Sequence, residues 1–349
     1  MFGKRNHLFG LDIGSKTIKV AELVENKNLF TLKKIGITDI LPGLIEEGMI
    51  RQPEAVAELI RKFLKSVNIK EQNVAISVGG YSVIAKKISL QNMSEEQLQD
   101  RINYEAEQYI PYDVNDVNLD FQILGTNENN PNLMDVLLVA ARKEFIKEYV
   151  DLVQMAGLNP CVIDVDGFAL QNIFEMNYDT SEESIALIDI GACKTSLNIM
   201  NRNASAFMRD VSLGCSQIDH QIMSTINCTA EEADHIKFGA KTDRISSDQL
   251  RNIVSSVYAS WCSEIKRALD FYYSTYQADQ IKRIVLSGGG ANIKDFHDLL
   301  SIETSTEVEM FNPFENFNID DKFDSAYLQQ IAPQLVICMG LATRRVDDK

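Results

Sequence analysis

Two short segments of the sequence combine carboxylates, glycines and lysines in an order suited to binding phosphate groups. Residues 9–23 read FGLDIGSKTIKVAEL and residues 186–200 read ALIDIGACKTSLNIM, so each apolar run ends in Asp-Ile-Gly before small or hydroxyl residues. Backbone N–H groups of such a glycine turn can donate to phosphate oxygens. Asp12 and Asp189 stand where a hydrated Mg²⁺ would lie, because Mg²⁺ prefers a few carboxylates together with waters and phosphate oxygens. We therefore expect ATP with Mg²⁺ as the ligand.

A third glycine turn, Gly288 to Gly290, follows the apolar run IVLS in the second half of the chain. A single Asp-Ile-Gly is more often an ordinary turn, but the two copies lie 189 − 12 = 177 residues apart. This spacing, together with the third turn, favours a nucleotide held between two lobes. The residues predicted to contact phosphate are Gly14, Ser15, Lys16, Thr17 and Lys19 in the first turn, and Gly191, Ala192, Lys194, Thr195 and Ser196 in the second.

The elements around these turns predict two duplicated α/β lobes. Each Asp-Ile-Gly segment is typical of a β-hairpin, because glycine permits the tight turn. In the first half, residues 53–67 have the apolar periodicity of a helix and residues 73–78 form a buried strand. In the second half, Ser246 and Gln249 form a capping box for a long helix that leads to a strand at 283–286.

Between residues 89 and 156 the pattern changes, which indicates a small inserted α+β subdomain. Ser94 and Gln97 make another capping box, and the helix that follows must end near Pro111. Residues 119–124 and 136–141 predict a hairpin, followed by a helix over 144–156. We therefore expect a first lobe over 1–88 and 157–180, an insert over 89–156 and a second lobe over 181–349.

Composition argues against several classes of partner and cofactor. The net charge is −16 and the pI is near 4.8, so nucleic acid and anionic lipid would be repelled. The six cysteines are scattered without a Cys-x-x-Cys pair, and the four histidines lack metal-ligand spacing, which favours a reducing compartment. The N-terminus is not typical of a signal peptide, and no apolar stretch approaches the roughly 20 residues of a membrane span. We expect a cytoplasmic protein unless a partner tethers it.

The order LDIGSKTIKV, IDIGACKTSL and IVLSGGGANI resembles the phosphate-one, phosphate-two and adenosine motifs of the actin-like ATPase superfamily. The resemblance implies two ribonuclease-H-like lobes, and it assigns Asn292 to the adenosine turn beside the three glycines. It also suggests that residues 163–174 and 333–344 are helices crossing between the lobes. The residues that match superfamily positions for ribose and adenine are Glu232, Asp234, Lys237, Glu264 and Arg267. The alternative for these five is a pair of solvated helix faces.

Longer stretches are similar to the PilM family of type IV pilus assembly proteins. They include EAEQYIPYDVNDVNLDFQILG, AGLNPCVIDVDGFALQN, NPFENF and APQLVICMGLATR, in the expected order. Like the FtsA family, this family carries its insert on a different side of the first lobe from actin. The resemblance implies a groove for the N-terminal cytoplasmic peptide of a PilN-like bitopic inner-membrane protein, and peripheral membrane attachment through it. It also suggests pilus motor ATPases and self-association as further contacts, whereas the groove residues follow from no motif.

Three functional hypotheses remain open at the level of the sequence. The first is an ATP-dependent scaffold of the pilus assembly platform with at most weak ATPase activity. Asp166 is the only candidate for orienting an attacking water, and a helix N-cap role competes with it. The second is a sugar-type small-molecule kinase, which shares the three turns. The third is an FtsA-like filament protein, against which we note that no amphipathic helix follows RRVDDK.

Overall fold

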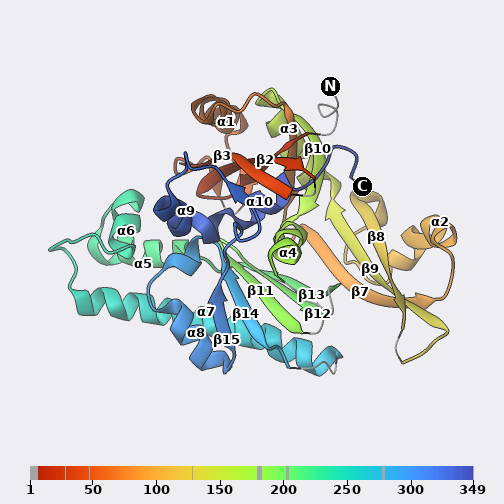
Figure 1. Cartoon of the computed structure of the whole chain (residues 1–349). Coiled ribbons are helices and arrows are strands. Elements are labelled where there is room, and N and C mark those ends of the chain that lie inside the picture. The colour runs from red at the N-terminus through yellow and green to blue at the C-terminus, as the bar shows by residue number, and fades with distance from the viewer. Residues whose placement is uncertain are drawn as a thin grey trace.

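The computed structural model describes residues 7–27, 29–46, 48–127, 129–178, 183–201, 204–276 and 280–348. Two mixed sheets form the centres of an upper and a lower lobe, and a smaller sheet extends to one side (Figure 1). The two lobes are therefore α/β, as the sequence predicts, and the smaller sheet is antiparallel, as expected for an α+β insert.

The sheet of the first lobe has the strand order β10-β6-β1-β2-β3-β16 across the described residues. Its strands are β1 (Phe9–Ile13), β2 (Thr17–Asn26), β3 (Leu29–Asp39), β6 (Asn73–Val78), β10 (Asn159–Val165) and β16 (Asn318–Ile319). One face is covered by α1 (Pro53–Val67) and α3 (Lys143–Met155), whose apolar residues form a shared core with β1 and β6. The short strands β4 (Ile45–Glu46) and β5 (Met49–Ile50) pair with each other beside this core.

The sheet of the second lobe has the order β13-β12-β11-β14-β15. Its strands are β11 (Ser184–Ile190), β12 (Thr195–Asn201), β13 (Ala204–Val211), β14 (Arg283–Ser287) and β15 (Glu307–Met310). The long helix α7 (Ser247–Tyr276) packs beneath this sheet with α5 (Ser216–Ile226) and α8 (Phe296–Thr304), while α6 (Ala230–Lys237) packs against α5 (Figure 1). Ser246 and Gln249 form the predicted capping box at the start of α7.

Both predicted hairpins are present, and they have the same register. In β1–β2, Asp12 is paired with Lys19 across the strands. In β11–β12, Asp189 is paired with Ser196. In each lobe the first hairpin strand also has a parallel neighbour, β6 or β14. The internal repeat of the sequence is thus a repeat of strand pairing.

The smaller sheet has the order β7-β9-β8, and α2 (Glu95–Ala106) packs on one of its faces. Its strands are β7 (Val83–Gln91), β8 (Val117–Thr126) and β9 (Leu133–Arg142). The capping box at Ser94 is formed as predicted. Because all of β7 belongs to this sheet while α3 packs on the first lobe, we propose that the insert spans about 83–142 rather than 89–156.

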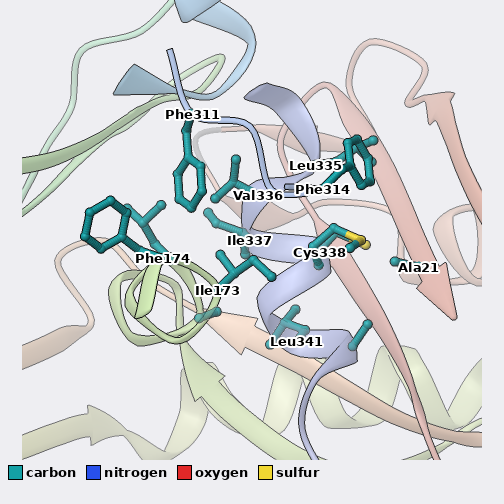
Figure 2. Packing of buried hydrophobic residues seen from close by; sticks show 14 of the residues in the cluster. Ala21, Ile173, Phe174, Phe311, Phe314, Leu335, Val336, Ile337, Cys338 and Leu341 are labelled. Carbon is teal, nitrogen blue, oxygen red and sulfur yellow. The ribbon is translucent and has the colours of Figure 1, made fainter. Parts of the chain in front are cut away.

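Helices α4 (Asp166–Asn177) and α10 (Val336–Ala342) lie between the two large sheets and share one core with both of them (Figure 2). The short helix α9 (Ser325–Ile331) leads towards α10. A Cβ on Gly340 would lie 1.9 Å from the carbonyl oxygen of Ala169, so the predicted crossing of the two helices is confirmed. The predicted bounds were too long, because residues 163–165 belong to β10 and residues 333–335 to a 3-10 turn. A Cβ on Gly10 of β1 would likewise lie 2.3 Å from the Cys338 carbonyl oxygen. We therefore propose that the C-terminal helix belongs with the first lobe, not the second.

Candidate functional site

The first turn is built around a buried ion pair. Lys19 Nζ donates to Asp12 Oδ2 at 2.8 Å, and both side chains are nearly buried, at 13% and 12% exposure. The turn is closed by a hydrogen bond of 3.1 Å from the Gly14 N–H to the Thr17 carbonyl oxygen. The carboxylate of Asp12 is therefore already neutralised by a residue of its own hairpin.

The second turn carries a carboxylate without a lysine in the corresponding place. Ser287 Oγ, at the end of β14, donates to Asp189 Oδ2 at 2.9 Å. Burial raises the pKa of Asp189 to about 6, although the Ser287 hydrogen bond and the charge of Lys19 oppose this shift. The charge of Asp12 raises the same pKa further, so the two aspartates from opposite lobes lie within electrostatic range of each other.

Ser196 adds an unsatisfied hydroxyl beside Asp189. Directly paired residues of antiparallel strands project to the same face of a sheet, and these two are so paired. Ser196 is 4% exposed, and its Oγ has no hydrogen-bond partner among the described residues. A buried hydroxyl of this kind costs free energy unless a water or ligand satisfies it.

Lys16 of the first turn reaches into the second lobe. Its Nζ forms a close ion pair with Asp234 Oδ1 of α6 and a longer one, 3.4 Å, with Asp219 Oδ2 of α5. Lys237 Nζ also lies 2.6 Å from Asp219 Oδ1 and 2.9 Å from Asp234 Oδ1. A two-lysine, two-aspartate cluster therefore joins the first turn to α5 and α6.

Lys194 of the second turn reaches in the opposite direction. It forms a close ion pair with Asp166 at the start of α4, and its Nζ lies 3.5 Å from Asp210 Oδ2 of β13. Asp210 also accepts from the N–H of Gly80, in the loop between β6 and β7. A Cβ on Gly79 would lie 2.3 Å from the Lys194 ammonium, so this loop packs directly on the pair.

The predicted N-cap role of Asp166 is wrong. Val165 occupies the cap position of α4, and Asp166 is the first helical residue. Burial opposes its ionisation, but the charge of Lys194 and hydrogen bonds from Lys194 and Ser77 hold the pKa of Asp166 below its usual range. The Asp166 side chain forms an ion pair instead of capping the helix, because Lys194 of the other lobe lies next to it. A paired carboxylate of low pKa is also a poor general base.

The third turn has a clear packing role. Gly288 has a left-handed φ of +84°, and a Cβ there would lie 2.4 Å from the Ile190 carbonyl oxygen. A Cβ on Gly290 would lie 2.3 Å from Ile190 Cγ2, whereas Gly289 has open space. The side chain of Asn292 donates to the Gln330 carbonyl oxygen at 3.1 Å. This turn therefore lies against the end of β11, the first strand of the second hairpin.

The residues matched to ribose and adenine are divided by the structure. Lys237 and Asp234 belong to the cluster with Lys16, whereas Glu232 forms the capping box of α6 with Thr229. Glu264 and Arg267 pair with each other at 2.8 Å on α7. The described contacts do not join these two to the glycine turns. Likewise, Thr195 Oγ1 donates to the Leu213 carbonyl oxygen at 2.8 Å, so that hydroxyl is already used within the lobe.

Five residues that contact the charged groups were missed by the sequence interpretation: Ser77, Gly80, Asp210, Asp219 and Ser287. Ser287 had a local signal, since it immediately precedes the third glycine turn. The others lie in elements whose contact with the turns depends on how the lobes pack. Among the described residues, no group of three or more potential ligands could hold a metal directly. No helix in the same part of the chain is long and apolar enough to cross a bilayer.

Comparison with known proteins places this geometry in a family. The family model for type IV pilus assembly protein PilM matches residues 10–346. A solved structure described as the PilM-PilN type IV pilus biogenesis complex matches with a TM-score of 0.87 and 26% identity, covering 97% of this chain and 98% of that chain.

Two more distant structures share the actin-like fold. The ethanolamine utilization protein EutJ from Carboxydothermus hydrogenoformans matches with a TM-score of 0.57 and 13% identity over 96% of this chain and 88% of that one. MreB5 of Spiroplasma citri, solved bound to ADP, matches with a TM-score of 0.51 and 13% identity over 97% and 95%. The chain has an actin-like fold and belongs to the family of type IV pilus assembly protein PilM.

Proposed function

We propose that the protein is a cytoplasmic, ATP-binding scaffold of the type IV pilus assembly platform. In this proposal Mg-ATP lies between the lobes, and the N-terminal cytoplasmic peptide of a PilN-like inner-membrane protein binds the insert and the adjoining lobe. The observation that carries it is the convergence of Asp12, Lys19 and Asp189 from two hairpins of identical register. Membership of the PilM family, and the PilN partner named for the related complex, support the pilus role.

The phosphates would lie against the two hairpin turns. The backbone of residues 15–17 would supply N–H donors, because the Gly14 N–H already closes the turn, and Lys19 would supply charge from the adjoining strand. Asp189 is the better candidate for Mg²⁺, because its hairpin partner is the unsatisfied Ser196 rather than a lysine. Asp12 would contribute through water, since Lys19 already neutralises it. Bound Mg²⁺ would balance phosphate charge, and these residues would orient its water shell.

Thr195 and Asn292 are better assigned to structural roles than to phosphate, and Lys194, like Lys16, is held by an ion pair with the opposite lobe. Each of them makes a contact within the protein that a nucleotide would have to break. Gly288, Gly289 and Gly290 would border the adenosine, with only Gly289 open to a ligand. Glu264 and Arg267 remain candidates for the adenine side of the site only if a ligand rearranges their mutual ion pair.

Weak hydrolysis is part of the proposal. Asp166 is the acidic side chain that sequence reasoning offered as a base, and it is held by Lys194 with a lowered pKa. Nothing in the described contacts favours a sugar-kinase role over the scaffold. Turnover should therefore be slow and independent of added sugars.

A binding experiment tests both halves of the proposal. Immobilised N-terminal peptide of a PilN-like protein is incubated with the chain, with and without Mg-ATP. We expect capture that responds to Mg-ATP and weakens when Asp116 and Asp120, exposed in the insert, are changed to lysine. Asp248→Lys on α7 makes a similar charge change at an exposed site outside the insert and serves as the control. Equal capture by all variants, unaffected by nucleotide, would refute the proposal.

A further inference from the structure

The lysine of the first phosphate turn is occupied by the opposite lobe. Lys16 lies between β1 and β2, whereas its two partners, Asp219 and Asp234, lie on α5 and α6 of the second lobe. The contact thus joins residues 203 and 218 positions apart in the chain. It connects the turn of the first lobe that is proposed to hold phosphate with helices α5 and α6 of the second lobe.

The two carboxylates that accept Lys16 are held in place by a residue of their own lobe, Lys237. Lys237 is 1% exposed in its side chain, and it contacts Asp219 at 2.6 Å and Asp234 at 2.9 Å. A buried ammonium must keep such partners, because an unpaired buried charge is costly. Asp219 and Asp234 would therefore stay in place whether or not Lys16 reaches them.

The charge of this arrangement favours a second cation. Two carboxylates and one ammonium sum to a formal charge of 1 − 2 = −1, and Lys16 brings the cluster to zero. Burial opposes ionisation of Asp234, but the hydrogen bond from Lys16 and the charge of Lys237 hold its pKa below the usual range. The Asp234 carboxylate thus remains available as an acceptor for Lys16 at neutral pH.

A phosphate group would compete for the same ammonium. Lys16 is 35% exposed in its side chain and Asp234 25%, so this pair is accessible, unlike the buried pair of Lys237 with Asp219. When Lys16 leaves, Asp219, Asp234 and Lys237 keep a formal charge of −1. This charge stays in place and would repel an approaching triphosphate. Contacts of Lys16 with phosphate and with the second lobe therefore oppose each other.

We propose that Asp219 and Asp234 hold Lys16 in the nucleotide-free protein, so that they are affinity-determining residues which the phosphates of a nucleotide must displace from Lys16. This inference rests on the proposed nucleotide function. It implies that the lobes are linked through Lys16 without nucleotide, and through the phosphates once nucleotide is bound. Removing one carboxylate should then strengthen nucleotide binding instead of weakening it.

The test compares Asp234→Asn with wild type by calorimetric titration of Mg-ATP into the full chain. We expect at least about threefold tighter binding, the size set by an accessible ion pair. Asp234→Ala serves as a second variant should the first fold poorly, because alanine is well tolerated in a helix. Asp248→Asn removes the same charge at an exposed site of α7 and should leave the affinity unchanged.

Hydrogen exchange of the nucleotide-free protein provides a separate readout. Loss of the carboxylate should accelerate exchange in the first turn, residues 14–17, without a change in α7. Unchanged or weaker Mg-ATP binding by both Asp234 variants would overturn the proposal, since a ribose contact predicts weaker binding. If wild type binds no Mg-ATP, the proposed function itself fails, and the exchange of the first turn alone then decides whether Lys16 links the lobes.

Discussion

The two hairpin turns have the same sequence plan and the same strand register, yet their carboxylates have opposite surroundings. Asp12 is paired with Lys19 across its hairpin, whereas Asp189 is paired with Ser196. Ser196 occupies the position equivalent to Lys19, because both pairs are related by the same offset (196 − 19 = 177). One carboxylate is neutralised at 2.8 Å, and the other has a pKa raised to about 6 by burial. A duplicated backbone can therefore carry two different electrostatic roles, decided by one cross-strand residue.

The largest effect should come from making the first turn resemble the second. Lys19→Ser leaves Asp12 nearly buried without its ammonium, which should cost about 3 kcal/mol of unfolding free energy, because removing one partner of a buried pair leaves an uncompensated charge. Chemical denaturation measures this loss. Lys19→Ser combined with Asp12→Asn should recover most of the stability, and failure of this rescue would contradict the assignment.

The third turn packs closely on the end of β11 in the second hairpin, and a glycine substitution should reveal this contact. Gly288→Ala places a Cβ 2.4 Å from the Ile190 carbonyl oxygen at a positive φ, so we expect a loss of about 2 kcal/mol in unfolding free energy. Gly289→Ala, where the space is open, is the matched control and should lose much less. Thermal melts of the two variants provide the comparison, and equal melting temperatures would refute the packing argument.

The two aspartates should differ in their contribution to Mg-nucleotide binding. Asp189→Asn should weaken Mg-ATP binding by about tenfold, or about 1.4 kcal/mol, since it removes the carboxylate that has no lysine of its own. Asp12→Asn should weaken it less, because Lys19 already compensates that charge. Titrations at several Mg²⁺ concentrations test this order, and a reversed order would assign the metal to Asp12.

The smallest expected effect is a pH dependence confined to the second turn. The folded-state pKa of Asp189, about 6, lies above its ordinary value of 3.8. The stabilisation from the neutral carboxyl is therefore complete below pH 3.8 and is lost as the pH rises through about 6. Asp189→Asn should accordingly gain about 1 kcal/mol of stability relative to wild type between pH 5 and 7.5. A constant difference across that range would show that Asp189 does not titrate there.

Much of the fold could be predicted from local pattern. The hairpins, the α1 helix over 53–67, the capping boxes at Ser94 and Ser246 and the hairpin of the insert are all confirmed. Hydrophobic periodicity and capping are local properties, so the sequence carries them directly. The position of the insert boundary was harder, because α3 has the same periodicity whether it packs on the insert or on the first lobe.

The candidate site was predictable in outline and not in its connections. The residue types of the three turns pointed to phosphate, but the partners of Lys16 and Lys194 lie in the opposite lobe. Asp166 also illustrates this limit. Its place at a helix start suggested an N-cap, and only the packed lobes bring Lys194 to it.

The sequence by itself determined the hairpin repeat, the α/β class and the PilM family resemblance, because these depend on the order and spacing of residues along the chain. The tertiary structure alone decided which lysine neutralises which carboxylate, since ion pairs form between neighbours in space. Lys16 and Asp234 are far apart in sequence and close only after the two lobes have packed around α4 and α10.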